Sequence, residues 1–271
     1  MPARAYRLTP RSLSLTGLTG PTLDAVSLKL PEGIYTTLRT YERDRIIGLS
    51  AHLGRLIDSH AAVNKPRPID LAAIRAGLRQ IIERETAAAL RLRITTPFES
   101  EAVYISVEPF ESFPAEFYAR GVRCATSHLE RATPTAKHTS FIQPSRAEKA
   151  GTDPEIHELL MVNEAGEILE GFSSNYYAVM NGTLLTAGAG VLEGVTRQIV
   201  LAEAKEIIPV RLTPIHVSDL PNAAESFITS SGREVMPVRQ VDDVVFEAPG
   251  PVTKALMARY RAHILREAER L

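Results

Sequence analysis

The stretch of this chain that decides its fold is EGFSSNYY, Glu170–Tyr177. Lys137 lies thirty-three residues before it, and the segment LEGVTR, Leu192–Arg197, follows it. After that segment, apolar residues recur at helical spacing (Ile199, Val200, Ala202, Ala204 and Ile207). This periodicity predicts that Gly194 to Arg197 form a turn that opens a helix.

A lysine, a carboxylate and a helix-opening turn are the groups that pyridoxal 5′-phosphate (PLP) requires of a protein. The cofactor needs a lysine amine for its aldehyde, an acidic partner for its ring nitrogen and donors for its phosphate. An ionised carboxylate keeps the ring nitrogen protonated, so that the ring can accept electrons. Backbone N–H groups at a helix start suit a dianion. Lys137, Glu170 and the Gly194–Thr196 turn therefore predict a PLP site.

Three further motifs extend the pattern over most of the chain. They are GIYTT (33–37), AHLGRL (51–56) and ITSSGREVMPV (228–238). In this order and spacing, the motifs resemble those of the fold-type IV (class IV) PLP enzymes, which include branched-chain and D-amino-acid aminotransferases and aminodeoxychorismate lyase. The resemblance implies an α+β, two-domain fold, with a smaller N-terminal α/β domain and a larger C-terminal, strand-rich pseudo-barrel domain. It also implies a homodimer.

Carried over position by position, the resemblance assigns three residues to the cofactor ring. Lys137 would hold the PLP aldehyde as a Schiff base, and Glu170 would contact the pyridinium nitrogen. Leu192 would pack against a face of the ring. The residues that follow Glu170, from Ser173 to Asn175, are weaker candidates.

The resemblance assigns four residues to the phosphate. Arg55 would bind it with its guanidinium, and Val195 and Thr196 would add backbone and hydroxyl donors. Ser231 would add a hydroxyl from a second turn. His52, in the same motif as Arg55, is equally well explained as a helix-start residue and is assigned no chemistry.

The expected substrate pocket is where the chain departs from the family pattern. Tyr35 matches a family position that lines this pocket. Branched-chain enzymes carry a tyrosine five residues after the lysine, where this chain has Ile142. D-amino-acid enzymes place an arginine for the substrate carboxylate at the position of Thr96, so Arg91 or Arg93 is the candidate for that role here.

Each assignment has a structural alternative. Lys137 could be a solvated loop residue, and Glu170 could end the hairpin around residues 164–166. Arg55 could pair with a carboxylate on a helix surface, which is the usual fate of an exposed arginine. Ser231 could belong to an ordinary turn, because serine and glycine both favour turns. Tyr35 could be a core residue.

Composition places the chain among folded proteins with two domains. It has 271 residues, of which 44% are hydrophobic and 23% charged. Because a domain typically has roughly 150 residues, this length suggests two domains. The net charge of −1 gives no reason to expect nucleic acid or an anionic membrane as a partner. The single cysteine, Cys124, fits a reducing cytoplasm. With no apolar run of about 18 residues and no signal-peptide pattern, we expect a soluble, cytoplasmic protein.

The chain is expected to divide into a small N-terminal α+β domain over 1–110, a linker over 111–120, and a large C-terminal domain over 121–271 that carries the cofactor lysine. In the first domain, a strand over 35–41 is expected to form a hairpin with a strand over 45–49. Apolar stripes predict two helices after it, and strands over 90–95 and 103–107 are expected to pair. In the second domain, Asn181-Gly182 predicts a hairpin. Helices are predicted over about 196–206 and 252–269. A ligand site between the two domains is the expectation from this split.

These features predict an aminotransferase that moves an amino group between an amino acid and a 2-oxo acid. The alternative from the same family is aminodeoxychorismate lyase, because Thr36-Thr37 and His138 resemble that branch. A cofactor-free relative with a binding or structural role is the alternative from another class. The presence of both Lys137 and Glu170 argues against it.

Overall fold

The computed structural model describes residues 1–271, and their contacts divide the chain into two compact units. Unit 1 comprises Met1–Ser112, Ala136–Pro144 and Arg266–Leu271, and unit 2 comprises Phe113–Thr135 and Ser145–Leu265. The segment around Lys137 therefore belongs to unit 1, whereas the sequence analysis placed it in the C-terminal domain. Its backbone explains the difference, because Tyr35 N donates to Lys137 O at 2.9 Å and Ile34 forms an antiparallel bridge with His138.

Unit 1 is built on a five-stranded sheet with the order β2-β1-β6-β5-β3. Its strands are β1 (Ala3–Thr9), β2 (Ser12–Gly20), β3 (Gly33–Arg39), β5 (Leu90–Pro97) and β6 (Val103–Pro109). Neighbouring strands all run antiparallel. The predicted pairing of the strands near 90–95 and 103–107 is confirmed, with Ile94 opposite Ile105.

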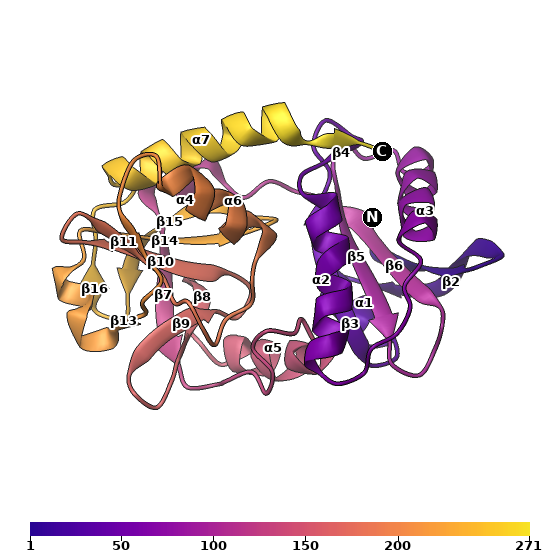
Figure 1. Ribbon diagram of the computed structural model, residues 1–271, viewed down its shortest axis with the longest axis horizontal. Coiled ribbons are helices and arrows are strands. Elements are labelled where there is room, and N and C mark those ends of the chain that lie inside the picture. The colour runs from indigo at the N-terminus through magenta and orange to yellow at the C-terminus, as the bar shows by residue number, and fades with distance from the viewer. The chain divides into compact units, whose positions relative to one another are not determined.

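Helices α2 (Leu49–Ala62) and α3 (Leu71–Arg84) lie beside this sheet (Figure 1). The Asp70 side chain caps α3 by accepting from Ala73 N, because the first N–H groups of a helix have no partner within it. Apolar residues of both helices pack with those of the strands in one core; they include Leu53, Leu56, Ile74, Leu78, Leu92 and Ile94. A short helix, α1 (Leu23–Ser27), packs with Ala3 and Ala5 in a smaller cluster.

The hairpin predicted between residues 35–41 and 45–49 is present only at its turn, where Tyr41 and Arg45 form an antiparallel bridge. The second strand is only β4 (Arg45–Ile46), and it pairs with β17 (Glu269–Arg270) near the end of the chain. Strand β3 pairs instead with β5, so that Tyr35 lies opposite Thr95. The segment between β3 and β4 turns through Glu42 and Arg43, which both have positive φ.

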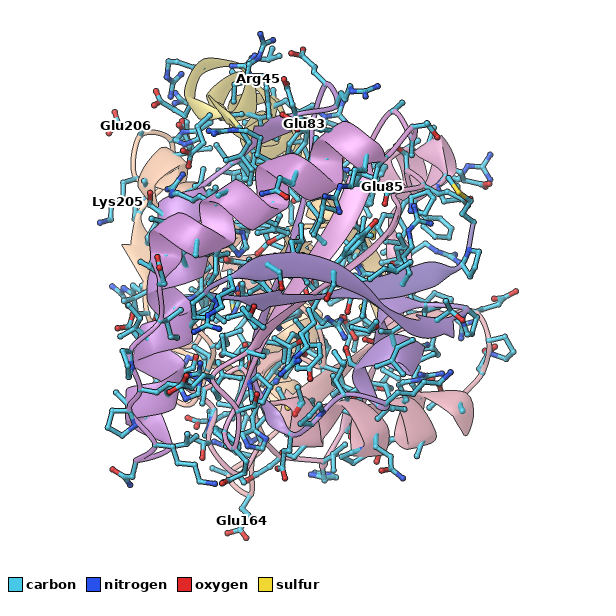
Figure 2. The ribbon with its side chains drawn as sticks, turned by 90° about the vertical axis from the view of Figure 1, so that its right-hand side faces the viewer. Arg45, Glu83, Glu85, Glu164, Lys205 and Glu206 are labelled. Atoms are coloured by element: carbon cyan, nitrogen blue, oxygen red, sulfur yellow. The ribbon has the colours of Figure 1, made fainter.

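A buried carboxylate follows α3. Glu85 is 3% exposed, pairs with Arg4 and accepts from Tyr6 Oη at 3.4 Å. Figure 2 labels it beyond the end of the helix. Because Arg4 and Tyr6 belong to β1, this carboxylate ties the helix to the sheet.

Unit 2 is a strand-rich barrel. Its strands are β7 (Val122–Ser127), β8 (Ile156–Val162), β9 (Glu167–Gly171), β10 (Asn175–Met180), β11 (Thr183–Leu185), β12 (Val210–Arg211), β13 (Ile215–His216), β14 (Glu225–Ser230), β15 (Glu234–Val241) and β16 (Val244–Val245). The path β10-β14-β15-β7-β8-β9 closes on itself because β9 also pairs with β10. The closing pair is Glu170 opposite Asn175.

The predicted turns and helices of unit 2 are confirmed. Asn181 and Gly182 have φ of 50° and 69° in the β10–β11 hairpin, as a type I′ turn requires. Glu164 projects from the tip of the β8–β9 hairpin (Figure 2). The helices are α6 (Val195–Ala204) and α7 (Pro251–Glu267), and the start of α7 is capped by the buried Glu225 carboxylate, which accepts from Thr253 N at 2.8 Å.

The remaining helical segments are short. Helix α4 (Ala115–Arg120) lies within the stretch predicted as the interdomain linker, over 111–120. Helix α5 spans Ile142–Ala150, and the 3₁₀ helices η1 and η2 span Thr139–Phe141 and Val217–Asn222. None of the helices is both long and apolar enough to cross a membrane.

Candidate functional site

Unit 1 holds Lys137 by its backbone. Lys137 N donates to Ser59 Oγ on α2 at 3.3 Å, and its carbonyl accepts from Tyr35 N on β3. The lysine segment therefore extends the edge of the sheet and is also tied to α2. The Lys137 ammonium lies 4.9 Å from the centre of the Tyr35 ring. Lys137 is half-buried, which leaves the amine close to an aromatic face.

Tyr35 also contacts Arg93. The Arg93 guanidinium lies 4.6 Å from the centre of the Tyr35 ring. It is buried, and it pairs with Asp24 Oδ1 at 2.8 Å and donates to Ser27 Oγ at 2.8 Å and Thr37 Oγ1 at 3.1 Å. The structure thus brings together Tyr35 and Arg93, the two residues predicted for the substrate. It gives the arginine partners on α1 and β3.

Arg55, the predicted phosphate ligand, lies on α2 beside two buried side chains. Its Nη2 donates to Thr36 Oγ1 at 2.6 Å and lies 3.3 Å from His52 Nδ1, and Thr36 Oγ1 lies 2.9 Å from the same His52 nitrogen. Burial lowers the pKa of His52 well below its usual value, and the charges of Arg55 and Lys137 lower it further. The imidazole is therefore neutral at physiological pH.

Unit 2 holds Glu170 as a buried carboxylate with three partners. Its side chain is 2% exposed. Oε2 accepts from Asn175 Nδ2 at 3.0 Å and from Leu192 N at 3.1 Å, and Oε1 lies 3.1 Å from Arg131 Nε. Burying a carboxylate is costly unless it is paired and hydrogen-bonded, and these partners compensate that cost and fix the orientation of Glu170.

Arg131 was missed in the sequence analysis. Its side chain is 4% exposed, it pairs with Glu170 and its Nη2 donates to Phe172 O at 2.6 Å. An arginine six residues before Lys137 has no local pattern that marks it as buried. Asn175, named only as a weaker candidate, is also central, since Nδ2 bridges Glu170 and Leu192 O at 2.9 Å.

The segment after Leu192 opens α6 as predicted. Its first residue is Val195, and the N-cap residue Gly194 makes no side-chain cap. A side chain at Gly194 would collide with Asn175 Oδ1, so glycine lets the helix start approach the Glu170 network. Val195 and Thr196 are buried, and Thr196 Oγ1 lies 3.4 Å from Tyr260 Oη.

The segment that contains Ser173 is held by a second buried carboxylate. Glu158 Oε2 accepts from Ser173 Oγ at 2.7 Å and from Ser174 Oγ at 3.0 Å. Arg233 Nη1 lies 3.3 Å from the same oxygen and donates to Ser173 Oγ at 2.9 Å. Ser231 lies at the turn between β14 and β15, two residues before this arginine.

Each unit therefore assembles part of the predicted set. In unit 1, the Tyr35 ring contacts both Lys137 and Arg93. Arg55 contacts Thr36 and His52. In unit 2, Leu192 N donates a hydrogen bond to the Glu170 carboxylate, and Val195 and Thr196 begin helix α6 three residues further along the chain.

Comparison with known proteins identifies the class that this fold and these residues define. The model of the class IV aminotransferase family matches residues 33–241. The chain belongs to that family, whose members are enzymes that use PLP.

Among individual proteins, a Thermotoga maritima protein named a probable branched-chain-amino-acid aminotransferase is 29% identical over 246 residues, covering 87% of this chain and 88% of that protein. A solved structure of a Thermotoga maritima protein, provisionally named a branched-chain amino acid aminotransferase, is 26% identical with a TM-score of 0.80 and covers 96% of both chains. The structure of 4-amino-4-deoxychorismate lyase from Pseudomonas aeruginosa, 24% identical, covers 87% of this chain and 92% of its own, with a TM-score of 0.71. At that identity it shows the fold alone.

Proposed function

We propose that this protein binds PLP and transfers an amino group between an amino acid and a 2-oxo acid. The observation that carries the proposal is the buried Glu170 carboxylate, fixed by Asn175, Leu192 and Arg131 in a member of the class IV aminotransferase family. A carboxylate oxygen can accept more than one hydrogen bond. Glu170 can therefore bind a protonated ring nitrogen while it keeps its present partners.

Further residues are proposed for the phosphate and the face of the cofactor ring. Arg55 is the proposed charged ligand of the phosphate. Val195 and Thr196 offer backbone N–H groups at a helix start with no side-chain cap, which is a common site for phosphate. Ser231 adds a hydroxyl from the β14–β15 turn, and Leu192 packs against the ring.

Lys137 is the proposed covalent anchor and proton carrier. PLP supplies an aldehyde that reacts with amines and a ring that accepts electrons when a bond at the substrate Cα breaks. Once the substrate amine has taken its place, the Lys137 amine would act as the general base that moves a proton between the substrate Cα and the cofactor. The centre of the Tyr35 ring lies 4.9 Å from this amine. Tyr35 and Arg93 are the proposed substrate-binding residues.

The relatives named for branched-chain amino acids support an amino acid with an apolar side chain as the substrate. Aminodeoxychorismate lyase is the second candidate, supported by Thr36-Thr37 and His138. It is the weaker one, because the lyase structure covers less of the chain at a lower TM-score than the aminotransferase structure.

We also propose a homodimer in the cytoplasm. The buried, unpaired Cys124 suits a reducing compartment. The β1–β2 hairpin exposes Leu15 on an edge strand of unit 1, and exposed edges and apolar side chains tend to be covered by partners. Light scattering at micromolar concentration tests the dimer, and a fully active monomer refutes it.

The decisive experiment is reduction with borohydride, followed by digestion and mass spectrometry. We expect the pyridoxyl group on Lys137, and a label on any other lysine refutes the site. A panel of L- and D-amino acids then identifies the donor by conversion of bound PLP to pyridoxamine phosphate. Release of pyruvate from aminodeoxychorismate, without amino transfer from any amino acid, would favour the lyase instead.

A further inference from the structure

A buried histidine beside the proposed phosphate ligand has no role in the function described above. His52 is 1% exposed and Thr36 is 0% exposed, and both contact the guanidinium of Arg55. Thr36 comes from β3, whereas His52 and Arg55 lie one turn apart on α2. The three side chains therefore join the helix to the sheet at the point where Arg55 leaves the helix.

The hydrogen atoms in this cluster can be assigned from its chemistry. An arginine only donates, so Thr36 Oγ1 must accept at the 2.6 Å contact with Arg55 Nη2. The single hydroxyl hydrogen of Thr36 is then available for His52 Nδ1 at 2.9 Å. His52 Nδ1 must accept, because it also faces the Arg55 Nη2 donor at 3.3 Å.

We propose that Thr36 and His52 are positioning residues that hold the Arg55 guanidinium in the orientation in which it binds the cofactor phosphate, with His52 as a neutral acceptor that carries its proton on Nε2. The inference rests on the proposed function of Arg55. A protonated His52 would turn a donor toward Thr36 and place a second positive charge beside the guanidinium, so the arrangement requires the neutral ring. The lowered pKa of His52, caused by burial and by its cationic neighbours, agrees with this requirement.

The physical benefit is preorganisation. A free arginine side chain loses rotamer entropy when it is fixed on a ligand. An arginine already held by two buried acceptors loses less on binding, so its charge-assisted bonds contribute more to affinity. The effect is specific to a ligand that carries the phosphate.

The test compares the affinity of the apo-protein, full length, for PLP and for pyridoxal, which lacks the phosphate. We expect Thr36→Val to weaken PLP binding about tenfold, in line with the loss of a hydrogen bond to a charged group, and to change pyridoxal binding less than about twofold. Thr36→Ser, which keeps the hydroxyl, should restore the PLP affinity. The matched control is Thr40→Val. Thr40 is also a buried threonine, it directly follows β3, and its hydroxyl accepts from Leu90 N at 2.9 Å. It should leave the ratio of the two affinities unchanged.

A second pair of variants tests the histidine independently, and provides an answer if Thr36→Val does not fold. His52→Leu should lower the ratio of PLP to pyridoxal affinity, and His52→Asn, whose amide oxygen can take the place of Nδ1, should recover most of it. Equal loss of both affinities in His52→Leu and Thr36→Val would mean a purely structural role and would overturn the inference.

Arg55→Ala separates the inference from the function on which it rests. If Arg55→Ala lowers the affinity ratio but the Thr36 and His52 variants do not, the positioning role is wrong and the phosphate ligand stands. If Arg55→Ala itself leaves the ratio unchanged, Arg55 does not bind the phosphate and both proposals fail.

Discussion

Replacement of Arg131 by methionine tests whether the Glu170 carboxylate is held as an ion pair. The two side chains are 4% and 2% exposed, and Arg131 Nε lies 3.1 Å from Glu170 Oε1. At an effective dielectric constant of about 20, Coulomb's law gives roughly 5 kcal/mol for such a pair. Asn175 and Leu192 still donate to Glu170 after the change, so the loss should fall near the lower end of the ~3–5 kcal/mol typical of a broken buried pair.

The assay is urea unfolding of the apo-protein, with the free energy of unfolding compared at constant m-value. We expect Arg131→Met to cost about 3 kcal/mol, but only ~1 kcal/mol when Glu170→Gln is already present, because no charge is then left unpaired. Arg123→Met is the control. Arg123 pairs with Asp153 and Glu155, which are 48% and 72% exposed, and its loss should cost less than about 1 kcal/mol. If the Arg131 and Glu170 changes add to within about 0.5 kcal/mol, the pairing argument is refuted.

Four further predictions concern single residues. Lys137→Ala should abolish both the pyridoxyl label and turnover, and residual turnover above about 1% of wild type would contradict the role of Lys137 as anchor and base. Glu170→Gln should keep PLP bound but lower kcat by roughly 10²- to 10³-fold, as expected for the loss of one preorganised electrostatic group; unchanged kcat would refute its role. Burial, with a further effect of the Arg233 charge, lowers the pKa of His157 to about 4, below the ~6.5 of an unfolded chain. The contribution of the neutral His157 to stability is therefore present above pH ~6.5 and is lost as the pH falls toward 4. In His157→Gln, the urea midpoint should depend less on pH across that range. Gly171→Ala should cost ~1–3 kcal/mol, because the new methyl group would collide with the Ser174 side chain, and an unchanged urea midpoint would show that the turn can move aside.

Local patterns predicted most of the helices and many of the strands. The apolar stripe predicted α3, and Asn181-Gly182 predicted the β10–β11 hairpin. These features depend on residues close together in the chain. Strands β1 and β2 were not predicted, because β2 contains Gly17 with φ of 79° and its register with β1 shifts between Arg4 and Tyr6. Such a shift breaks the alternation that marks a strand.

What the sequence could not supply were contacts between distant residues. Lys137 joins unit 1 through a backbone hydrogen bond with Tyr35, and His138 joins it through an antiparallel bridge with Ile34. No local pattern in the sequence indicates such a pairing. Arg131 is marked only by its buried partner, Glu170. Glu170 itself could be proposed from the sequence because its motif is local and because a cofactor with a cationic ring requires an acid.

The pairing of Glu170 with Asn175 is also the last link in the ring of strands in unit 2. A ligand bound to Glu170 favours every conformation in which β9 and β10 are joined, because it stabilises the state to which it binds by RT ln(1 + [L]/Kd), about 2.7 kcal/mol at a hundredfold excess over Kd. The carboxylate that is proposed to keep the ring nitrogen protonated would then also help to close the barrel. By the same linkage, the seam between β9 and β10 would open less often with the ligand bound than without it.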